Sequence, residues 1–246
     1  GAAPAPICWT EATGNLDVTS VLTYGSSKWT NSTGFANAGT NKGVKTNLYG
    51  TANGWLISQA IDLGVTPGLY RVKYNMAVTS YNGTAAQTTL GTHVVNVVVS
   101  TDGGTTWSNA NIIKTYTGDG SYSNTGQVEI INLSSYSGVV KIAFYQNTIS
   151  TTPDIDFHID DFVVEAIPAT PTLFASPVSL ACGYGPNGGY SAEKIFALSG
   201  ESLTGAPGQI TVTAPANFEV SLTPGTGFAS SVLVDYATPT LASTNI

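Results

Sequence analysis

Residues 94–107 read Val-Val-Asn-Val-Val-Val-Ser-Thr-Asp-Gly-Gly-Thr-Thr-Trp, and this stretch decides the fold class. Its first half is rich in β-branched residues, which predicts a strand over residues 94–100. Its second half fits the pattern S-x-D-x-G-x-T-W, in which the Asp102 carboxylate can accept hydrogen bonds from turn N–H groups. Gly103 and Gly104 permit the positive φ angles of such a turn, and Trp107 is expected to pack beneath it. The stretch therefore predicts a strand that ends in a tight turn, which is typical of an all-β protein.

Short alternating runs of Val, Ile, Thr and Tyr recur outside this stretch and are separated by Gly, Asn, Asp and Pro. They predict further strands over residues 69–80, 112–117, 127–133, 139–147 and 157–164. No segment sustains the apolar spacing of an amphipathic helix. We therefore expect residues 1–167 to form a jelly-roll β-sandwich.

The segment Pro168-Ala169-Thr170-Pro171-Thr172 interrupts this pattern, and we interpret residues 168–172 as a linker. Beyond it, strands are expected over residues 193–199, 209–214, 218–222 and 230–234. Residues 173–246 fall short of the roughly 100 residues of an immunoglobulin-like sandwich, and no closing strand is apparent after residue 234. We expect a partial immunoglobulin-like β-sandwich here, with downstream domains of the same polypeptide as its partners.

The composition narrows the classes of partner. Only 9% of residues are charged, the net charge is −7, and the 8 Lys and Arg residues do not cluster. Nucleic-acid binding requires a basic footprint, so we expect no nucleic acid as a partner. No apolar run approaches the roughly 18 residues of a membrane span, so no membrane insertion is expected. A surface made polar by Thr, Ser, Asn and Gly indicates a secreted, extracellular protein.

The two cysteines, Cys8 and Cys182, leave two possibilities open. An oxidising compartment would permit a disulfide that ties the N-terminal segment to the second domain. The alternative is two unpaired thiols, and the sequence does not choose between them.

Three stretches together carry a resemblance to a known group of domains. They are residues 53–63, residues 97–107, and residues 131–144 continuing to the segment Phe157-His158-Ile159-Asp160-Asp161-Phe162-Val163-Val164. In this order they resemble the choice-of-anchor and cleaved-adhesin jelly rolls of Bacteroidetes, which are related to MAM domains. Residues 198–222 resemble the Ig-like spacer domains of secreted proteins from the same bacteria. The resemblance implies an accessory module of a larger secreted or cell-surface protein.

The last predicted strand of the first domain contains an irregularity. Ile159 and Phe162 are both apolar but lie three positions apart, so they cannot share one face of a regular strand. A β-bulge at Asp160-Asp161 would restore the phase and turn both carboxylates toward one rim.

This rim is the candidate metal site. Four of the 15 acidic residues, Asp154, Asp156, Asp160 and Asp161, fall within eight positions. Adjacent carboxylates repel one another, and calcium, which takes six to eight oxygen ligands, relieves that repulsion. The resemblance implies the same, because these jelly rolls often hold a structural calcium near the Asp pair of the final strand. We predict calcium as the cofactor, with Glu11 as a further candidate ligand; solvated turn carboxylates are the alternative.

Signals of catalysis are weak. The sequence has no G-x-S-x-G elbow, no pair of histidines with zinc spacing and no phosphate-binding loop, and a lone strand histidine such as His93 or His158 is more often structural. The triplet Asp154-x-Asp156-x-x-x-Asp160 has the spacing of three acidic residues in some jelly-roll glycosidases. Those enzymes have Glu at both outer positions, where this chain has the shorter Asp. The S-x-D-x-G-x-T-W turn, called an Asp-box, is a structural hairpin in sialidases and indicates folding rather than catalysis.

Exposed aromatic residues are the candidates for ligand binding, because an aromatic face stacks on the C–H groups of a sugar ring. Trp9, Trp29, Tyr24, Tyr49 and Tyr81 lie in or near turn-rich segments, and the first-choice set is Trp9, Trp29, Tyr49 and Tyr81. The alternative for each tyrosine is a half-buried strand residue.

Together these features predict a non-catalytic, calcium-stabilised module for adhesion or carbohydrate binding. Its expected partner is a polysaccharide or a host or surface protein. The alternatives are a purely structural spacer beside a catalytic domain and, less favoured, a jelly-roll glycoside hydrolase.

Overall fold

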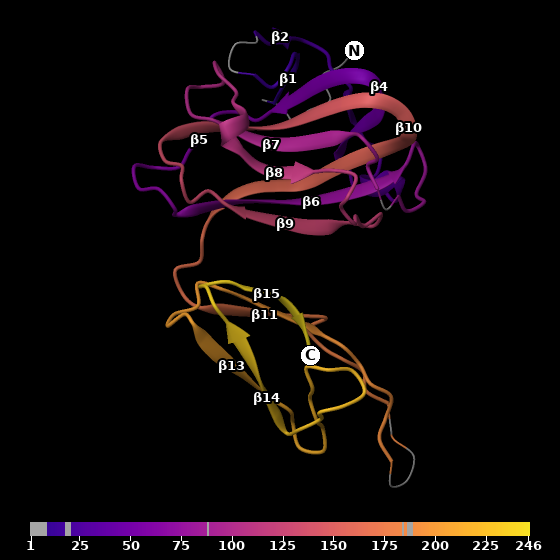
Figure 1. Ribbon diagram of the computed structural model, residues 1–246, viewed down its shortest axis with the longest axis vertical. Helices are drawn as coiled ribbons and strands as arrows, with labels where there is room; N and C mark the ends of the chain where they lie inside the picture. Colours follow the sequence, from indigo (N-terminus) through magenta and orange to yellow (C-terminus); the bar gives the residue numbers. More distant parts are fainter. Residues whose placement is uncertain (1–8, 18–20, 88, 184, 186–188) are drawn as a thin grey trace. The chain divides into compact units, whose positions relative to one another are not determined.

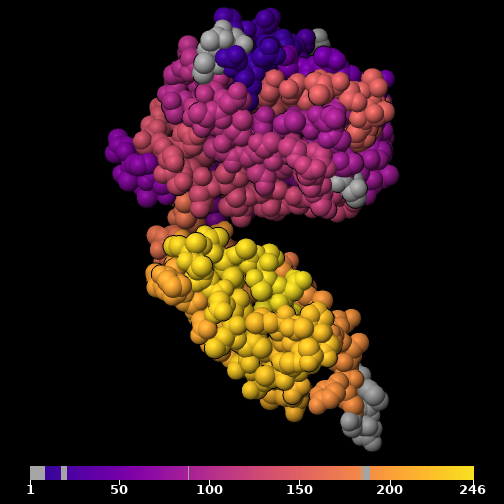
Figure 2. Space-filling model, viewed as in Figure 1, coloured from indigo at the N-terminus to yellow at the C-terminus, as the bar shows by residue number. Residues whose placement is uncertain are grey.

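A computed structural model describes residues 9–17, 21–87, 89–183, 185 and 189–246. The chain divides into two compact units, unit one up to Ala166 and unit two from Ile167 onward. Figures 1 and 2 colour unit one from indigo to salmon and unit two from orange to yellow. Across the described residues the fold is all β, as the sequence predicts, with only the short 3-10 turns η1 (Phe35–Asn37) and η2 (Asn109–Asn111) besides strands. No helix in this described part is long and apolar enough to cross a membrane.

The described residues of unit one form a β-sandwich of ten strands (Figure 1). Their bounds are β1 Thr10–Thr13, β2 Thr23–Tyr24, β3 Trp29–Asn31, β4 Val44–Ile57, β5 Ile61–Asp62, β6 Tyr70–Ser80, β7 Val94–Ser100, β8 Ile112–Tyr116, β9 Gln127–Asn132 and β10 Val139–Ala166. The predicted strands at β6, β7, β8 and β9 are confirmed to within one residue at each end.

Two long strands build both layers of the sandwich. The first part of β10, residues 139–147, pairs with β7 and with the end of β4, whereas its last part, residues 155–166, pairs with β6 and with the start of β4. The two strands cross from one layer to the other at a register shift between Ser150 and Ile155. Layer A is therefore β2-β1-β4-β10-β7-β8, and layer B is β3-β4-β10-β6-β9. The sequence predicted β10 as two separate strands, and the structure corrects this to one strand of 28 residues.

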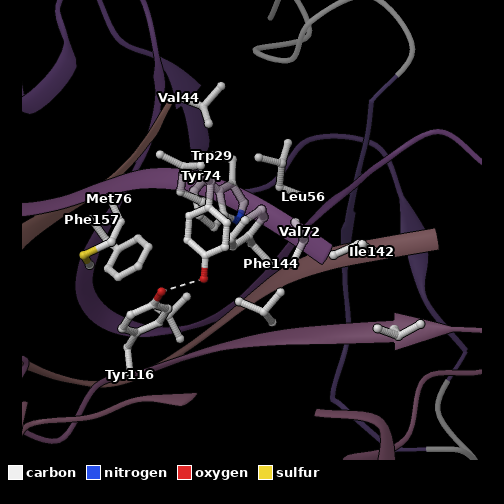
Figure 3. Packing of buried hydrophobic residues seen from close by; sticks show 14 of the residues in the cluster. Trp29, Val44, Leu56, Val72, Tyr74, Met76, Tyr116, Ile142, Phe144 and Phe157 are labelled. Carbon is white, nitrogen blue, oxygen red and sulfur yellow. Dashed lines mark hydrogen bonds between the residues drawn. The ribbon is translucent and has the colours of Figure 1, made fainter. Parts of the chain in front are cut away.

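The main core lies between the two layers (Figure 3). Alternate residues of β6, Val72, Tyr74, Met76 and Val78, point inward and are fully buried, as the period of two in a strand requires. The Tyr74 hydroxyl of layer B lies 2.5 Å from the Tyr116 hydroxyl of layer A. This hydrogen bond is a polar contact between the two layers in an otherwise apolar core.

The Asp-box hairpin after β7 forms as predicted. The Asp102 carboxylate accepts hydrogen bonds from the backbone N–H groups of Thr105 at 3.1 Å and Thr106 at 3.0 Å. The Thr106 hydroxyl also donates to this carboxylate, at 2.6 Å. Together these hydrogen bonds, that of the Thr106 hydroxyl foremost, hold the pKa of Asp102 well below its usual range. Trp107 is buried and its ring centroid lies 5.2 Å from that of Trp55, on the outer face of layer A. Trp107 of this motif thus belongs to a second, smaller apolar cluster.

Unit two contains a three-stranded sheet, β11-β12-β15, and a two-stranded sheet, β13-β14. The bounds are β11 Thr172–Ser176, β12 Ala197–Glu201, β13 Gly208–Thr213, β14 Ser231–Tyr236 and β15 Leu241–Asn245. The sequence indicated no strand after residue 234, and this was wrong, because β15 pairs with β12. Its Leu-Ala-Ser-Thr-Asn composition lacks the apolar alternation that marks the other strands. Cys182 is exposed in this unit, while Cys8 lies outside the described residues, so their pairing stays a prediction.

Candidate functional site

The outer face of layer B brings together most of the polar residues that the sequence singled out. On this face Asp156 lies between Thr79 of β6 and Asn47 of β4, and His158 lies between Ala77 and Lys45. Residues directly opposite in adjacent strands project to the same side of a sheet, so these side chains form successive rows. Part of the face is covered by the segment that contains η1, and part is open.

The open part is a row of three exposed residues, Tyr49, Asp154 and Tyr81, which we call the open row. The backbone N–H of Tyr81 donates to the Asp154 carbonyl at 3.2 Å, and Tyr49 is the next outward residue of β4 after Asn47. Tyr49 is 42% exposed and Tyr81 is 51% exposed. Because they flank β10 from β4 and β6, their backbones are separated by two strand spacings, about 10 Å.

Polar side chains fill the middle of the open row. The Asn47 amide donates to the Asp154 carboxylate at 2.8 Å and to the Ile155 carbonyl at 3.1 Å. The Lys28 ammonium donates to the Tyr49 carbonyl, which fixes the backbone at the point where β4 leaves layer B. The row therefore places two exposed tyrosines on either side of a carboxylate, which the Asn47 amide of the neighbouring row holds in place.

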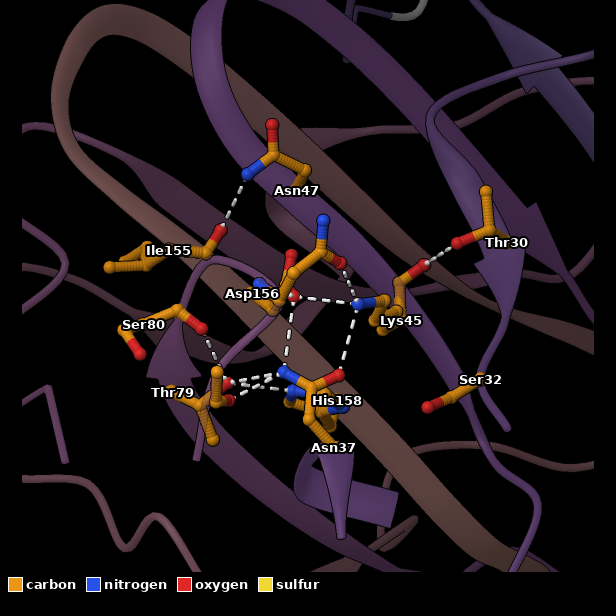
Figure 4. Close-up of polar contacts among 12 residues, drawn as sticks. Thr30, Ser32, Asn37, Lys45, Asn47, Thr79, Ser80, Ile155, Asp156 and His158 are labelled. Atoms are coloured by element: carbon orange, nitrogen blue, oxygen red, sulfur yellow. Dashed lines mark hydrogen bonds and ion pairs between the residues drawn. The ribbon is translucent and has the colours of Figure 1, made fainter. Parts of the chain in front are cut away.

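A second group joins Asn37 of η1 to four residues of the strands beneath it, and we call it the buried cluster (Figure 4): Asn37, Lys45, Thr79, Asp156 and His158. Asp156 is fully buried, and its Oδ2 atom accepts from the Lys45 ammonium at 2.7 Å and from the Asn82 N–H at 2.9 Å. The Lys45 ammonium also donates to the side-chain oxygens of Asn37 at 3.0 Å and Asn82 at 2.8 Å. A buried carboxylate is costly unless it is paired, and Lys45 is the pairing cation here.

His158 completes the buried cluster. It is fully buried, its Nε2 atom lies 3.0 Å from the Thr79 hydroxyl, and the Phe35 ring packs against it with a centroid separation of 6.1 Å. Burial lowers the pKa of His158 to about 4, although the nearby Asp156 carboxylate acts in the opposite direction. The imidazole is therefore neutral at pH 7 and serves as a packed core residue of this face.

The predicted β-bulge is confirmed. The β10–β6 register shifts between Asp160 and Val163, and Asp161 adopts a φ of 51°. As a result Ile159 is buried in the main core and Phe162 packs against the same core. The Asp160 carboxylate accepts from the Asn41 amide at 2.6 Å and from the Asp161 N–H at 2.8 Å. Burial raises the pKa of Asp160 from its ordinary value.

Four of the five residues predicted as calcium ligands have separate hydrogen-bond or ion-pair partners. Asp156 is paired with Lys45, Asp154 with Asn47, and Asp160 with Asn41, while Glu11 accepts from the Ser27 N–H and hydroxyl, both at 2.7 Å. Within the described ranges, no three acidic, His or Cys side chains are arranged to hold a metal ion. Calcium binding by this chain therefore stays a prediction.

The aromatic residues predicted to bind ligand differ in exposure and in position. Trp29 is only 1% exposed and belongs to the main core, so it must be removed from the ligand-binding set. Trp9 is half-buried and packs edge-on against Phe162 at 4.9 Å. Tyr24, in β2 of layer A, is 58% exposed but lies on a different layer from the open row. Tyr49 and Tyr81 are thus the two candidates that the fold brings to one face.

Sequence reasoning missed Lys45, Asn47 and Asn37. Lys45 and Asn47 alternate with inward residues on β4, and recognising that strand would have placed both on the outer face. Asn37 sits in a turn with a φ of 58°, and its sequence context carried no signal of a role in the site.

Comparisons with known proteins give only distant likeness. The sequence matches no protein-family model and no curated protein. The K1 cleaved adhesin domain of Lys-gingipain from Porphyromonas gingivalis W83 is similar with a TM-score of 0.43 and 16% identity, over 66% of this chain and 92% of that chain. TmCBM61 in complex with β-1,4-galactotriose is similar with a TM-score of 0.39 and 16% identity, over 64% of this chain and 88% of that chain.

A third solved structure is CsCBM6-3 from Clostridium stercorarium in complex with cellobiose. Its TM-score is 0.32 at 17% identity, over 57% of this chain and 86% of that chain. The similar structures thus include a cleaved adhesin domain and carbohydrate-binding modules. At these scores and identities the likeness carries no functional inference, so the function must be argued from the site.

Proposed function

We propose that unit one is a non-catalytic carbohydrate-binding module of an extracellular protein, and that the open row is its binding face. The observation that carries this proposal is the placement of Tyr49 and Tyr81 on either side of Asp154. Aromatic rings stack on the apolar faces of sugar rings, while carboxylate and amide groups bond to the sugar hydroxyls. The separation of about 10 Å between the two strands that carry the tyrosines suits a stretch of glycan chain rather than a single sugar.

The charge of the site restricts the substrate class. Asp154 lies at the centre of the open row, and the chain as a whole has a net charge of −7. A uronic acid or sulfated sugar would place like charges together, which weakens binding. The proposed ligand is therefore a neutral polysaccharide.

Burial of Asp156 supports a binding role over glycoside hydrolysis. A hydrolase of the type considered above needs two carboxyl groups beside one glycosidic bond. In the triplet Asp154, Asp156 and Asp160, the middle carboxylate is fully buried and paired with Lys45. A sugar in the open row would meet Asp154 but would be separated from Asp156 by the side chains that cover it.

Affinity gel electrophoresis with laminarin, xylan and a neutral galactan tests the proposal, with alginate as the anionic comparison. Retardation by at least one neutral polysaccharide is expected, and Tyr49→Ala or Tyr81→Ala should reduce it. Tyr24→Ala is the matched control, because Tyr24 is also exposed, at 58%, but lies on layer A. Migration unaffected by every polysaccharide, or equal retardation of all three variants, would refute the open row as the binding face.

A further inference from the structure

Three side chains of the buried cluster form a closed triangle of contacts (Figure 4). The Lys45 Nζ atom lies 2.7 Å from Asp156 Oδ2 and 3.0 Å from Asn37 Oδ1. The Asn37 amide nitrogen in turn donates to the same Asp156 oxygen at 3.3 Å. One carboxylate oxygen therefore contacts both a primary amine and the nitrogen of a primary amide, while the amine faces the carbonyl of that amide.

We propose that Lys45 and Asn37 become joined by an intramolecular isopeptide bond, with Asp156 as the proton carrier. Asp156 takes a proton from the Lys45 ammonium, and the neutral Nζ atom attacks Cγ of Asn37. The Nζ–Cγ bond forms and the Cγ–Nδ2 bond breaks. Of the three ammonium protons, one stays on the new amide nitrogen, one passes through Asp156 to Nδ2, which leaves as ammonia, and one stays on Asp156. Asp156 ends as a neutral acid, so the product leaves no unpaired charge in the buried site, and no oxidant or co-reactant is required.

Neighbouring hydrogen-bond acceptors fix the orientation of the Asn37 side-chain amide. The Asn37 Nδ2 atom donates to the Gly83 carbonyl at 2.7 Å and to the Thr79 hydroxyl at 3.1 Å, which fixes the amide with Oδ1 toward the lysine. Fixing a nucleophile beside its target in this way replaces a bimolecular encounter by a unimolecular step. The second oxygen of Asp156, Oδ1, has no hydrogen-bond partner in the described part of the chain and can hold a proton.

Burial favours the product over the starting ion pair. Asp156 is fully buried and the Lys45 side chain is 15% exposed, so both charges are held away from water. Desolvation disfavours charge, and proton transfer to give a neutral amine and a neutral acid relieves it. The amide product carries no charge at all on the former lysine.

Asn82 is the competing amide, because its Oδ1 atom is also in contact with Lys45, at 2.8 Å. Asn82 meets Asp156 through its backbone N–H and not through its side-chain amide. The carboxylate therefore has a direct proton path to the leaving nitrogen of Asn37 but not to that of Asn82. The bond would link the turn at η1 covalently to β4, so that η1 could no longer move away from the buried cluster. This role does not depend on glycan binding.

Mass spectrometry of the purified full chain tests this directly. The intact mass under denaturing conditions is expected to be lower than the sequence mass by one ammonia. Trypsin should then yield a branched peptide in which residues 29–42 are linked through Asn37 to residues 43–71, with no cleavage after Lys45. Fragmentation locates the link between the two side chains.

Variants separate this bond from other losses of ammonia. Lys45→Arg keeps the positive charge and Asp156→Asn keeps the shape, and both should restore the full sequence mass. Asp160→Asn, which changes a neighbouring carboxylate that contacts an asparagine but no lysine, should retain the loss. A wild-type chain of full sequence mass overturns the proposal, and so does an ammonia loss without the branched peptide, which would indicate a cyclic imide at an asparagine.

Discussion

The hydroxyl contact between Tyr74 and Tyr116 permits a test of how the two layers are held together. Both side chains are fully buried, and the contact joins β6 of layer B to β8 of layer A. Tyr74→Phe removes one hydroxyl and leaves the other buried without a partner, which costs about 1–3 kcal/mol. Tyr116→Phe should cost a similar amount. Replacing both removes the polar pair together, so the double variant should lose less stability than either single variant.

Urea unfolding followed by tryptophan fluorescence measures these free energies of unfolding. All four tryptophans, at positions 9, 29, 55 and 107, belong to unit one, so the signal reports on this unit alone. The expected coupling energy between the two substitutions is about 1–3 kcal/mol. Additive losses in the double variant would show that the two hydroxyls do not meet, and the assigned packing of the layers would be refuted.

The same pair predicts an alkaline response. Burial raises the pKa of both Tyr74 and Tyr116 above the usual value of about 10. In the unfolded chain these hydroxyls ionise near pH 10, whereas in the folded chain they stay neutral. Their contribution to stability is therefore fully present below pH 10 and is lost as the pH rises above it. The double phenylalanine variant should show a shallower loss over that range.

Three further predictions concern other parts of unit one. Burial lowers the pKa of His158 to about 4, so its contribution to the free energy of unfolding should be fully present above pH 6.5 and fall by on the order of 3 kcal/mol between pH 6.5 and 4. His158→Gln should flatten this pH dependence in urea titrations, and an unchanged dependence would contradict the prediction. Trp107→Ala should lower the free energy of unfolding by about 3–5 kcal/mol in denaturation followed by circular dichroism, because Trp107 is a buried anchor; a loss below 1 kcal/mol would show that the hairpin packs differently. If calcium is bound as the sequence predicts, a chelator should lower the Tm and added calcium should restore it, whereas an unchanged Tm would remove the site.

Local sequence patterns were sufficient to predict some elements of the fold. The β7 strand and its hairpin follow from β-branched residues, two glycines and one aspartate at fixed spacing. The bulge at Asp160-Asp161 follows from a phase conflict between two apolar residues three positions apart. Each of these features depends on residues within a few positions of one another.

The remaining features depend on contacts between distant parts of the chain. Strand β4 was not predicted as one strand of 14 residues, because it contains Gly and Asn where it passes from one layer to the other. Asp156 looked like a metal ligand because its cationic partner, Lys45, lies 111 residues away and could not be paired with it from sequence. Trp29 looked exposed because its segment is rich in polar residues, yet β3 turns its indole into the core. Predicting either outcome requires the strand order, which sequence periodicity does not determine.

Isothermal titration calorimetry with the neutral polysaccharide selected by affinity electrophoresis tests the central claim most directly. Tyr49→Ala and Tyr81→Ala should each weaken binding by roughly tenfold, about 1.4 kcal/mol, because each removes one stacking face. Tyr24→Ala should bind as the wild-type chain does, with all variants keeping the wild-type circular dichroism spectrum. Equal affinity in the wild-type, Tyr49→Ala and Tyr81→Ala proteins would contradict the assignment of the open row as the glycan-binding face.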